Sequence, residues 1–472
     1  MMKIYYILFA AFCLLFASCK PNVPSDAQEA DVEMFPDYQD VTVPVNISPL
    51  NFRLKSELEE GVAVFKSVSL EETVKADGGC FSMSLSRWHK LAASAAGSSI
   101  YVVVYFKAPN QSWKKKTFEI HVSPDSIDSY LTYRRIFPGY RMWNEMGIYQ
   151  RCLENFEEKT LLTNKLTNNN CVNCHSFCAN DGKKVLFHQR MYYAGTYVRN
   201  GEKLEKISYN KNGEEITLVY PYWHPSGEWI AFSTNETHQD FHFSDANRIE
   251  VYDVKSDVVL YNMKTKKVVS PDIISAADKF ETFPAFSPDG RKLIFCSADS
   301  VAMPERYKDV KYNLLEIDFN PETGALGNKI DTLYNAAANG CSVKFPRVSP
   351  NGKYLLFTTS AYGNFSIWHK DADLKMMDLE SKEFLDIKMA NSNDVESYHS
   401  WSSNSRWIVF SSRRLDGQFT RPFIAHVDEN GMISKPFLLP QESAYYYDRS
   451  MFSFNIPEFS FSESTTFKDF SK

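Results

Sequence analysis

The sequence lacks an excess of positive charge and, after its first twenty residues, any apolar run long enough to cross a membrane. Its 472 residues carry 52 Lys and Arg against 58 Asp and Glu, a formal net charge of −6. Without a global basic field, nucleic acid is excluded as the main partner. The Gly-x-Ser-x-Gly, Gly-x-Gly-x-x-Gly and Walker patterns are also missing. Their absence weakens a peptidase assignment and gives no sign of a nucleotide site.

The first twenty residues have the layout of a secretory signal. One lysine precedes an apolar run over residues 4–16, and small residues lead to Cys19. This run is shorter than the roughly 20 apolar residues that span a bilayer. The end of the run, "FASC", resembles a bacterial lipoprotein signal, which implies that Cys19 becomes the lipidated first residue. The sequence thus predicts a signal over residues 1–18 and a flexible polar tether over residues 19–40.

The residue after the lipidated cysteine bears on where the anchor lies. Lys20 follows Cys19, and no acidic run comes directly after it. We therefore expect a lipid anchor in the outer membrane with the protein facing the periplasm, and surface display is the alternative.

The cysteine content does not predict a fold held together by disulfides. Nine cysteines are present, and Cys13 and Cys19 belong to the signal, so an odd number remains. An odd number in an exported chain is a poor match to a disulfide framework. Four of the remaining cysteines lie far apart and are expected to be small buried apolar residues: Cys80, Cys152, Cys296 and Cys341.

One hairpin pattern recurs along the chain. Each copy has a strand, a turn built on Pro-Asp-Gly or a relative, and a second strand that ends in Phe. The copies are "YPYWHPSGEWIAFST" (220–234), "TFPAFSPDGRKLIFCSA" (282–298), "KFPRVSPNGKYLLFTTS" (344–360) and "SYHSWSSNSRWIVFSSR" (397–413). A variant, "HSFCANDGKKVLFHQR", begins at residue 175. Repeats of this kind predict the four-stranded blades of a β-propeller.

Five blades are visible in this way, and a sixth can be assembled from residues 130–139 and 147–164 with the C-terminal tail as its closing strand. The Ser-Pro-Asp-Gly hairpins resemble those of TolB-type β-propellers, which are relatives of WD40 repeats. The resemblance covers about residues 128–460 and implies a periplasmic binding or scaffold role. Propellers with such repeats also occur in peptidases and lyases, so the resemblance indicates fold rather than activity.

Residues 41–123 have a different pattern. Short runs alternate apolar and polar residues, as in "GVAVFKSVSL" and "IYVVVYFK", with one helical insertion, "RWHKLAASAA". The expected structure is a small β-sandwich of immunoglobulin or fibronectin type. The predicted fold is therefore all-β: a sandwich over residues 41–123 and a six-bladed TolB-like propeller over residues 124–472.

Residues 168–191, "NNNCVNCHSFCANDGKKVLFHQRM", contain a Cys-x-x-Cys-His triplet. Covalent attachment of a c-type haem needs two thiols at this spacing and an adjacent histidine. Cys171 and Cys174 are predicted to form the thioethers, and His175 is predicted to be the proximal iron ligand. Export fits this interpretation, because c-type haem is attached outside the cytoplasm.

A haem iron usually takes a second axial ligand. The same hairpin returns with His188 and Met191, and His399 occupies in "YHSW" the repeat position of His175 in "CHSF". These three residues are the candidate sixth ligands, and an open sixth position is the remaining possibility.

Three other interpretations of the triplet remain open. Zinc could bind Cys171, Cys174, His175 and Cys178, although adjacent strand residues alternate faces and would strain a tetrahedral site. A redox disulfide could join Cys171 to Cys174, although the usual helix N-terminus is missing. The thiols could also be purely structural.

These observations lead to three functional hypotheses. The first is an envelope lipoprotein whose haem serves electron transfer or redox sensing, with a redox protein as its partner. The second is a haem-free TolB-like scaffold that binds a protein or glycan at the cell envelope. The third is a metal-dependent glycan lyase, in which a loop gathers metal ligands: His224, His238, His242, Asp240 and Asp245.

Overall fold

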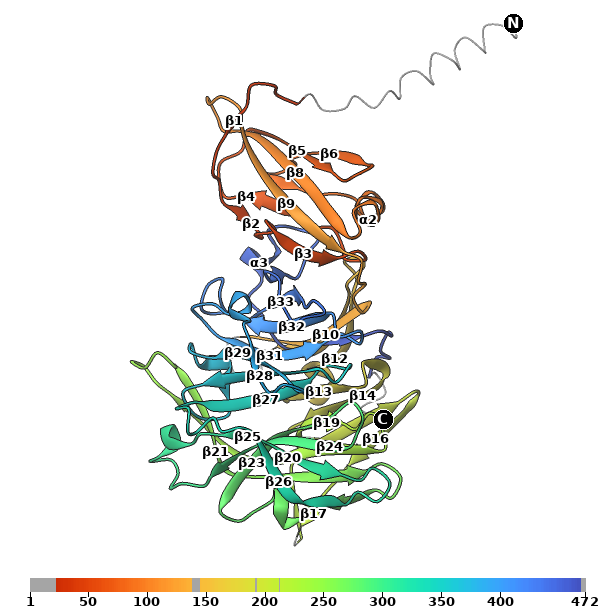
Figure 1. The fold of residues 1–472 in the computed structure, drawn as a ribbon, viewed down its shortest axis with the longest axis vertical. Helices are drawn as coiled ribbons and strands as arrows, with labels where there is room; N and C mark the ends of the chain where they lie inside the picture. Colours follow the sequence, from red (N-terminus) through yellow and green to blue (C-terminus); the bar gives the residue numbers. More distant parts are fainter. Residues whose placement is uncertain (1–22, 138–144, 192, 212, 468–472) are drawn as a thin grey trace, which may run out of the picture.

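The computed structural model describes residues 23–137, 145–191, 193–211 and 213–467. The described chain is built almost entirely of strands, with α-helices α2 (Leu85–Ser94) and α3 (Tyr446–Arg449). Figure 1 shows an elongated molecule with a smaller N-terminal domain at one end and a larger group of sheets below it. The predicted signal and Cys19 lie outside the described residues. Within the described ranges, none of the helices has the length and apolar character needed to cross a membrane.

The N-terminal domain consists of two sheets and α2. The larger sheet has the order β1-β9-β8-β5-β6, and β3 also pairs with β9. Its strands are β1 (Gln28–Glu29), β3 (Val41–Pro44), β5 (Glu60–Lys66), β6 (Glu71–Lys75), β8 (Ser98–Lys107) and β9 (Lys114–Ser123). The smaller sheet contains β2 (Met34–Phe35), β4 (Phe52–Leu54) and β7 (Cys80–Phe81). Both β1 and β3 run parallel to β9, whereas the other pairs are antiparallel.

Alternation of side chains explains why these segments form a two-sided layer. In β8, Ile100, Val102 and Val104 are buried, and the residues between them are more exposed. A period of two residues places every second side chain on the same face of a strand. Helix α2 covers this core with Trp88, whose indole nitrogen donates a hydrogen bond of 2.9 Å to the carbonyl of Ile47.

The segment expected to be a flexible tether differs from that expectation in its second half. Strands β1 and β2 fall within residues 19–40 and pair with β9 and β4. Met34 and Tyr38 are buried in the core of the N-terminal domain. Burial of such large apolar side chains stabilises the ordered chain enough to offset its lost conformational entropy.

The remaining strands form six four-stranded antiparallel sheets in the described part of the chain. Five of them use four strands in chain order: β13 (Val172–Cys178), β14 (Asp181–Gln189), β15 (Gly195–Asn200) and β16 (Lys203–Ile207); β19 (Val219–Trp223), β20 (Trp229–Phe241), β21 (Ile249–Asn262) and β22 (Lys267–Val269); β23 (Lys279–Phe286), β24 (Lys292–Asp299), β25 (Asn313–Phe319) and β26 (Leu326–Tyr334); β27 (Ser342–Val348), β28 (Tyr354–Ser360), β29 (Asp373–Asp378) and β30 (Phe384–Leu385); and β31 (Glu396–Trp401), β32 (Trp407–Ser412), β33 (Arg421–His426) and β34 (Phe437–Leu438). A separate short hairpin joins β17 (Asn210–Lys211) to β18 (Glu214–Glu215).

The last sheet joins the two ends of this region. Its order is β12-β11-β10-β35, with β10 (Tyr130–Ile136), β11 (Met146–Cys152), β12 (Glu158–Thr163) and β35 (Ser453–Ser460). The first strands of neighbouring sheets contact one another in the series β13, β19, β23, β27, β31 and β35, and β35 contacts β13 in turn. The sheets therefore surround one axis, which is the architecture of a β-propeller. In Figure 1 the blue C-terminal region lies beside the orange strand β10.

The recurring hairpin turn joins the first two strands of a sheet and touches the sheet before it. Gly290 in the β23–β24 turn has a φ of 71°, a conformation that favours glycine. A Cβ atom at this position would lie 2.1 Å from the His224 ring. The carbonyl of Gly290 instead lies 3.0 Å from Nε2 of His224. The turn glycine thus allows close contact between two neighbouring sheets.

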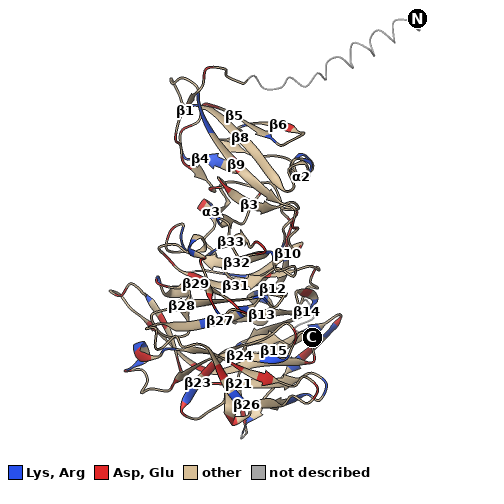
Figure 2. Cartoon of the chain, viewed as in Figure 1, with Lys and Arg blue, Asp and Glu red and all other residues tan. Residues whose placement is uncertain are grey.

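The N-terminal domain is fixed to the propeller by a shared core and by polar contacts. One apolar cluster includes Trp88 of the N-terminal domain and Trp407 of β32. Asp125 pairs with Arg406 at 2.9 Å, close to the turn between β31 and β32. Arg53 pairs with Asp448 of α3 at 2.7 Å. Figure 2 shows acidic and basic residues intermixed over both parts of the chain, in keeping with the small net charge.

Candidate ligand-binding site

The first strand of every propeller sheet contains the same β-bulge. In each sheet two consecutive residues of the first strand lack a partner in the register, and one residue of the second strand lies opposite them. The bulged pairs are Cys174-His175, Tyr220-Pro221, Phe283-Pro284, Phe345-Pro346, Tyr398-His399 and Ile456-Pro457. The first residue of each pair has a positive φ between 47° and 53°. A repeated bulge of this kind re-aims a side chain in the same way in every sheet.

The first bulged residues form an axial ring. We define the axial ring as Cys174, Tyr220, Phe283, Phe345, Tyr398 and Ile456. The Phe283 and Phe345 ring centroids are 4.2 Å apart, and those of Phe345 and Tyr398 are 5.0 Å apart. Tyr220 contacts Phe283 at 4.5 Å between ring centroids. These separations are typical of favourable aromatic pairs, so the axial ring packs as an apolar plug on the propeller axis.

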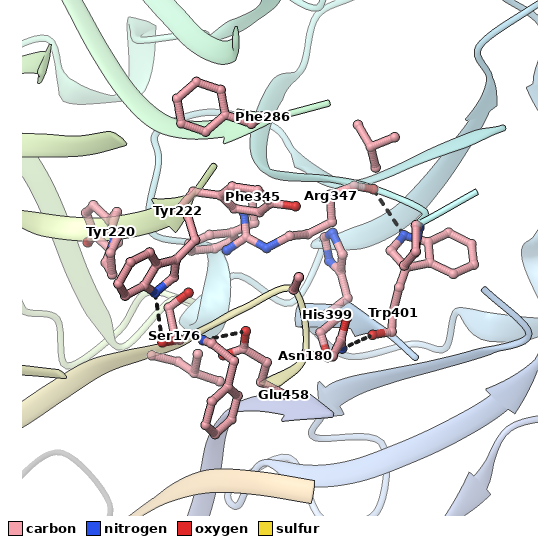
Figure 3. Close-up of a pocket in the computed structure, with 18 of the residues that line it drawn as sticks. Ser176, Asn180, Tyr220, Tyr222, Phe286, Phe345, Arg347, His399, Trp401 and Glu458 are labelled. Atoms are coloured by element: carbon pink, nitrogen blue, oxygen red, sulfur yellow. Dashed lines mark hydrogen bonds between the residues drawn. The ribbon is translucent and has the colours of Figure 1, made fainter. Parts of the chain in front are cut away.

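A pocket of about 360 Å³ lies against this plug. We call the residues two positions after each axial-ring residue the wall positions: Ser176, Tyr222, Ala285, Arg347, Ser400 and Glu458. All of them except Ala285 line the pocket. Figure 3 shows Tyr222, Arg347 and Glu458 reaching the pocket from different sheets. Trp223, Phe286 and Trp401 add aromatic surface to the lining, as is common in small-molecule sites.

Arg347 is the cationic member of the wall positions. Its guanidinium carbon lies 5.0 Å from the centroid of the Tyr222 ring, within the range of a cation–π contact. One of its terminal nitrogens donates a hydrogen bond of 2.8 Å to the carbonyl of Pro346. Burial lowers the pKa of Arg347 from its ordinary value, but a guanidinium stays protonated in proteins. The pocket therefore contains a fixed positive charge.

Glu458 is the acidic member of the wall positions and is largely enclosed. One carboxyl oxygen accepts a hydrogen bond of 3.0 Å from the backbone N–H of Phe177. Burial raises the pKa of this carboxyl to about 8, against smaller opposing effects of the Phe177 N–H and of Arg347. Because desolvation disfavours the charged form, Glu458 is mostly protonated at neutral pH. Among the described residues it makes no ion pair with Arg347 within 4.0 Å.

The Cys-x-x-Cys-His triplet falls on this repeating framework. Cys174 belongs to the axial ring, and His175 takes the second bulge position, which is proline in four of the sheets. The ring of His175 is 3% exposed, and burial lowers its pKa to about 3. Neither ring nitrogen has a hydrogen-bond partner of ordinary geometry among the described residues. A neutral, enclosed imidazole at this position packs between neighbouring sheets.

The three candidate sixth ligands lie in different places. His399 occupies the same bulge position as His175, in β31, and its Nε2 lies 3.1 Å from the carbonyl of Leu356. His188 is buried in β14, where its Nδ1 lies 3.1 Å from the hydroxyl of Thr196. Met191 is 60% exposed after the end of β14. None of these observations brings them to one face of His175.

The positions of the triplet residues do not fit a haem. A porphyrin attached to both thiols and ligated by the imidazole needs one open face beside all three residues. Cys171 and Cys174 are 7% and 4% exposed, and Cys171 lies outside the pocket lining. The backbone of Thr132 and Ile456 encloses the His175 ring. Haem attachment therefore stays a prediction from the sequence, without support from the surrounding contacts.

The metal-binding alternatives find no assembled ligand set. Across the described ranges, no three His, Cys, Asp or Glu residues are grouped so as to hold a metal ion. His224 sits in the β19–β20 turn and contacts Gly290, whereas the ring of His238 stacks on Tyr252 with 6.0 Å between centroids. Asp245 pairs with Lys308 at 3.1 Å. These side chains thus have separate structural contacts.

The cysteines of the described residues are unpaired and differ in burial. Both thiols of the Cys-x-x-Cys pair are unbridged, as are the other cysteines among the described residues. Cys296 is fully buried, as expected for a small apolar residue. Cys80, Cys152 and Cys341 are instead half-buried.

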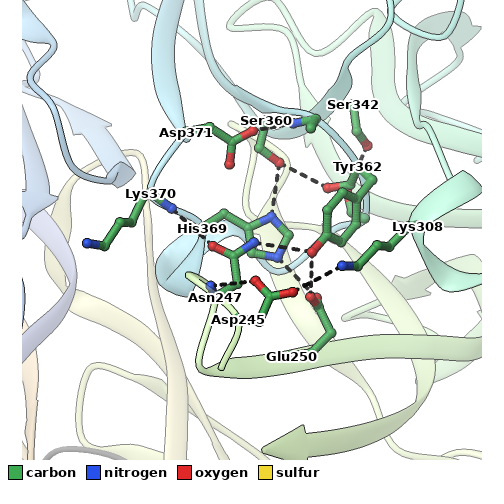
Figure 4. A network of polar contacts seen from close by, with 12 residues as sticks. Asp245, Asn247, Glu250, Lys308, Ser342, Ser360, Tyr362, His369, Lys370 and Asp371 are labelled. Atoms are coloured by element: carbon green, nitrogen blue, oxygen red, sulfur yellow. Dashed lines mark hydrogen bonds and ion pairs between the residues drawn. The ribbon is translucent and has the colours of Figure 1, made fainter. Parts of the chain in front are cut away.

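A second polar cluster lies away from this pocket, at the long β20–β21 hairpin. Glu250 is 2% exposed and accepts a hydrogen bond of 2.8 Å from the hydroxyl of Tyr362. Its other oxygen lies 3.0 Å from Nε2 of His369. Figure 4 shows Asn247 and Lys308 completing the network around Tyr362. Since the buried carboxyl group has a partner on both oxygens, this network holds the hairpin against the β24–β25 and β28–β29 connections.

Sequence reasoning missed Tyr222, Arg347 and Glu458 as site residues. A signal was present in the repeats, because the segments "CHSF", "YPYW", "FPAF", "FPRV", "YHSW" and "IPEF" align on the bulge. Their third letters are the wall positions. The residue type at this third position differs among the repeats, although the rest of the segment is similar. The wall positions therefore give the pocket a different side chain from each sheet.

Comparison with known proteins gives fold neighbours only. No family model and no curated protein matches the chain. Among solved structures, TolB from Acinetobacter baumannii is similar at 12% identity and a TM-score of 0.45, over 80% of this chain and 85% of that one. A puromycin-hydrolyzing peptidase from Mycobacterium tuberculosis is similar at 10% identity and a TM-score of 0.37, over 85% and 57% of the two chains. The β-propeller domain of the Trilobed protease from Pyrococcus furiosus is similar at 11% identity and a TM-score of 0.33, over 69% of this chain and 78% of that one. All three TM-scores are below 0.5. The sheet order and the closed ring of contacts identify the propeller independently.

Proposed function

We propose that this chain is a binding module: a six-bladed TolB-like propeller with an N-terminal sandwich domain, whose axial pocket receives a ligand. The observation that carries the proposal is the pocket of about 360 Å³ at the axis, closed on one side by the axial ring. Pockets of this size with mostly apolar walls and a few convergent polar groups are the usual form of ligand sites.

The division between plug and wall supports this function. The axial ring consists of Phe and Tyr in four sheets and of Cys and Ile in the other two, all uncharged. The wall positions differ from sheet to sheet in size and charge. A purely structural axis would gain nothing from a partly buried guanidinium at one wall position, because desolvating a charge is unfavourable. A binding role would explain Arg347, because its guanidinium could contact the ligand. The predicted lipoprotein signal would hold this module at the cell envelope, where the partner would be a protein or a glycan.

Electron transfer is a separate proposal that depends on the Cys171, Cys174 and His175 triplet alone. No contact described here favours it over the binding role. Among the described residues, no metal-ligand set supports the glycan-lyase alternative.

The test fills the pocket without changing its framework. Ser176→Tyr places at one wall position the residue that the next sheet already carries at Tyr222, so the backbone should accept it. Ser69→Tyr, at an exposed position of the N-terminal domain, is the matched control. The mature protein is screened by saturation-transfer NMR against N-acetyl amino acids and monosaccharides, and unchanged thermal midpoints would show that both variants fold.

We expect a subset of these probes to bind the wild type and the Ser69→Tyr protein, and to lose binding in Ser176→Tyr. Equal binding by all three proteins would show that the probes bind elsewhere and would contradict the proposal. Absence of binding to the wild type by every probe would also count against it.

A further inference from the structure

The pocket has an uncompensated charge. The side chains lining it include several that titrate, and most are neutral near pH 7. Burial lowers the pKa of both His175 and His399 to about 3. It raises the pKa of Glu458 to about 8 and that of Cys174 above its ordinary value. The lining tyrosines, with pKa values raised by burial, also remain protonated. Arg347 is therefore the lining side chain that carries charge.

The surroundings of Arg347 leave it without a counter-ion. In the described part of the chain, no carboxylate lies within 4.0 Å of its guanidinium, and Glu458 is the acidic group that acts on it. A single hydrogen bond to the Pro346 carbonyl uses one of its five N–H donors. Tyr222 supports the flat face of the guanidinium, so the edge that carries the donors stays available to a ligand.

We infer that the axial pocket binds an anion: a carboxylate carried next to an aromatic or aliphatic group, with the carboxylate held by Arg347. This inference rests on the proposed function and specifies the ligand class of the same site. A guanidinium matches a carboxylate with two parallel hydrogen bonds. Such a pair would also supply the counter-ion that a partly buried charge otherwise lacks.

The rest of the lining favours an apolar neighbour for that carboxylate over a sugar. Trp223, Phe286 and Trp401 present ring surface to the pocket, together with several prolines. The indole nitrogens of Trp223 and Trp401 already donate to the carbonyls of Ser176 and Arg347. These residues therefore offer apolar area rather than the many hydrogen bonds that sugar hydroxyls require. The C-terminal residue of a peptide, with its side chain in the apolar part, has this chemistry.

The experiment compares matched probes on the mature protein by isothermal titration and ligand-detected NMR. N-acetyl-phenylalanine and N-acetyl-leucine supply the carboxylate, their amides are the neutral controls, and glucuronate supplies a carboxylate on a sugar. Arg347→Ala introduces the residue found at the equivalent wall position, Ala285, so the strand should accept it. Arg347→Lys keeps the charge but removes the paired donors.

We expect the N-acetyl amino acids to bind about tenfold or more tightly than their amides, since hydrogen bonds to charged groups contribute more than neutral ones. Arg347→Ala should remove this preference and leave amide binding unchanged. Arg347→Lys should retain part of it. Binding of the carboxylates should weaken at high salt.

The outcomes separate this inference from the proposed function. If Ser176→Tyr abolishes binding but Arg347→Ala does not, the pocket binds ligands and the anion inference is wrong. If glucuronate binds through Arg347 while the N-acetyl amino acids do not, the apolar part of the inference is wrong. If no probe binds the wild-type protein, both the inference and the proposed function are contradicted.

Discussion

The axial ring predicts a large and local loss of stability when its best-connected member is truncated. Phe345 is 4% exposed, and its ring centroid lies 4.2 Å from that of Phe283, 5.0 Å from Tyr398 and 6.3 Å from Tyr220. Phe345→Ala should lower the free energy of unfolding of the propeller by about 3 to 5 kcal/mol, the usual range for a buried Phe. The upper half of that range is expected, because each aromatic pair adds about 0.5 to 1.5 kcal/mol beyond its buried area.

The geometry of the ring explains why the cavity cannot collapse. The partners of Phe345 come from three other strands, each held by its own four-stranded sheet. Relaxation toward the vacancy would require movement of whole sheets, so most of the cavity would remain.

Urea denaturation followed by tryptophan fluorescence and circular dichroism measures this effect. Phe384→Ala is the matched control, because Phe384 is 45% exposed on the last strand of the same sheet. It should lower the free energy of unfolding by less than about 1.5 kcal/mol. Equal losses in the two variants, at unchanged slopes of the unfolding transition, would refute the idea that the axial ring is a packed plug.

Two further predictions concern titration and haem. The pKa of Glu458 is raised from 4.5 to about 8, so between these values the folded state binds more protons than the unfolded state and its stability falls as pH rises. Glu458→Gln should remove the part of this pH dependence that Glu458 causes. Thermal midpoints measured across this pH window test it: if they decrease equally with pH in both proteins, the reasoning is wrong. For the triplet, expression with haem-attachment machinery, followed by an absorbance spectrum and intact mass, decides between the alternatives. A Soret band lost on replacing Cys171 and Cys174 by Ala supports haem, whereas a colourless protein with free thiols supports the haem-free binding module.

The sequence reveals the propeller because its strongest signals are local. A turn residue with positive φ and a Phe in the next strand lie within one hairpin. The turn residue is Gly227, Gly290 or Gly352 in three hairpins and Ser405 in a fourth. That Phe is found opposite the bulge in five sheets: Phe187, Phe232, Phe295, Phe357 and Phe410. Such positions can be predicted without knowing what any other sheet does.

The site could be predicted only in part, because it depends on ring closure. The equivalence of "CHSF" and "YHSW" was visible, and it places His175 and His399 at the same step of their strands. The prolines of four other repeats were visible at this step too, but the β-bulge there was not. That bulge makes the histidine of the triplet a packing residue. Arg347 and Glu458 lie over a hundred residues apart, and only the closed ring brings both to one pocket. The Cys-x-x-Cys-His motif is recognisable because its residues are contiguous. Arg347 and Glu458 line the pocket but belong to no contiguous motif.

The strand that closes the circle also has a consequence for how the protein comes into being. Because β35 follows the other described strands and pairs with β10, the sheets cannot close into a ring until residues 453–460 have been made. Glu458 arrives with that same strand. A chain that ends shortly before residue 453 would lack both the closing strand and one wall of the pocket. Closure of the ring and completion of the pocket therefore depend on the same segment.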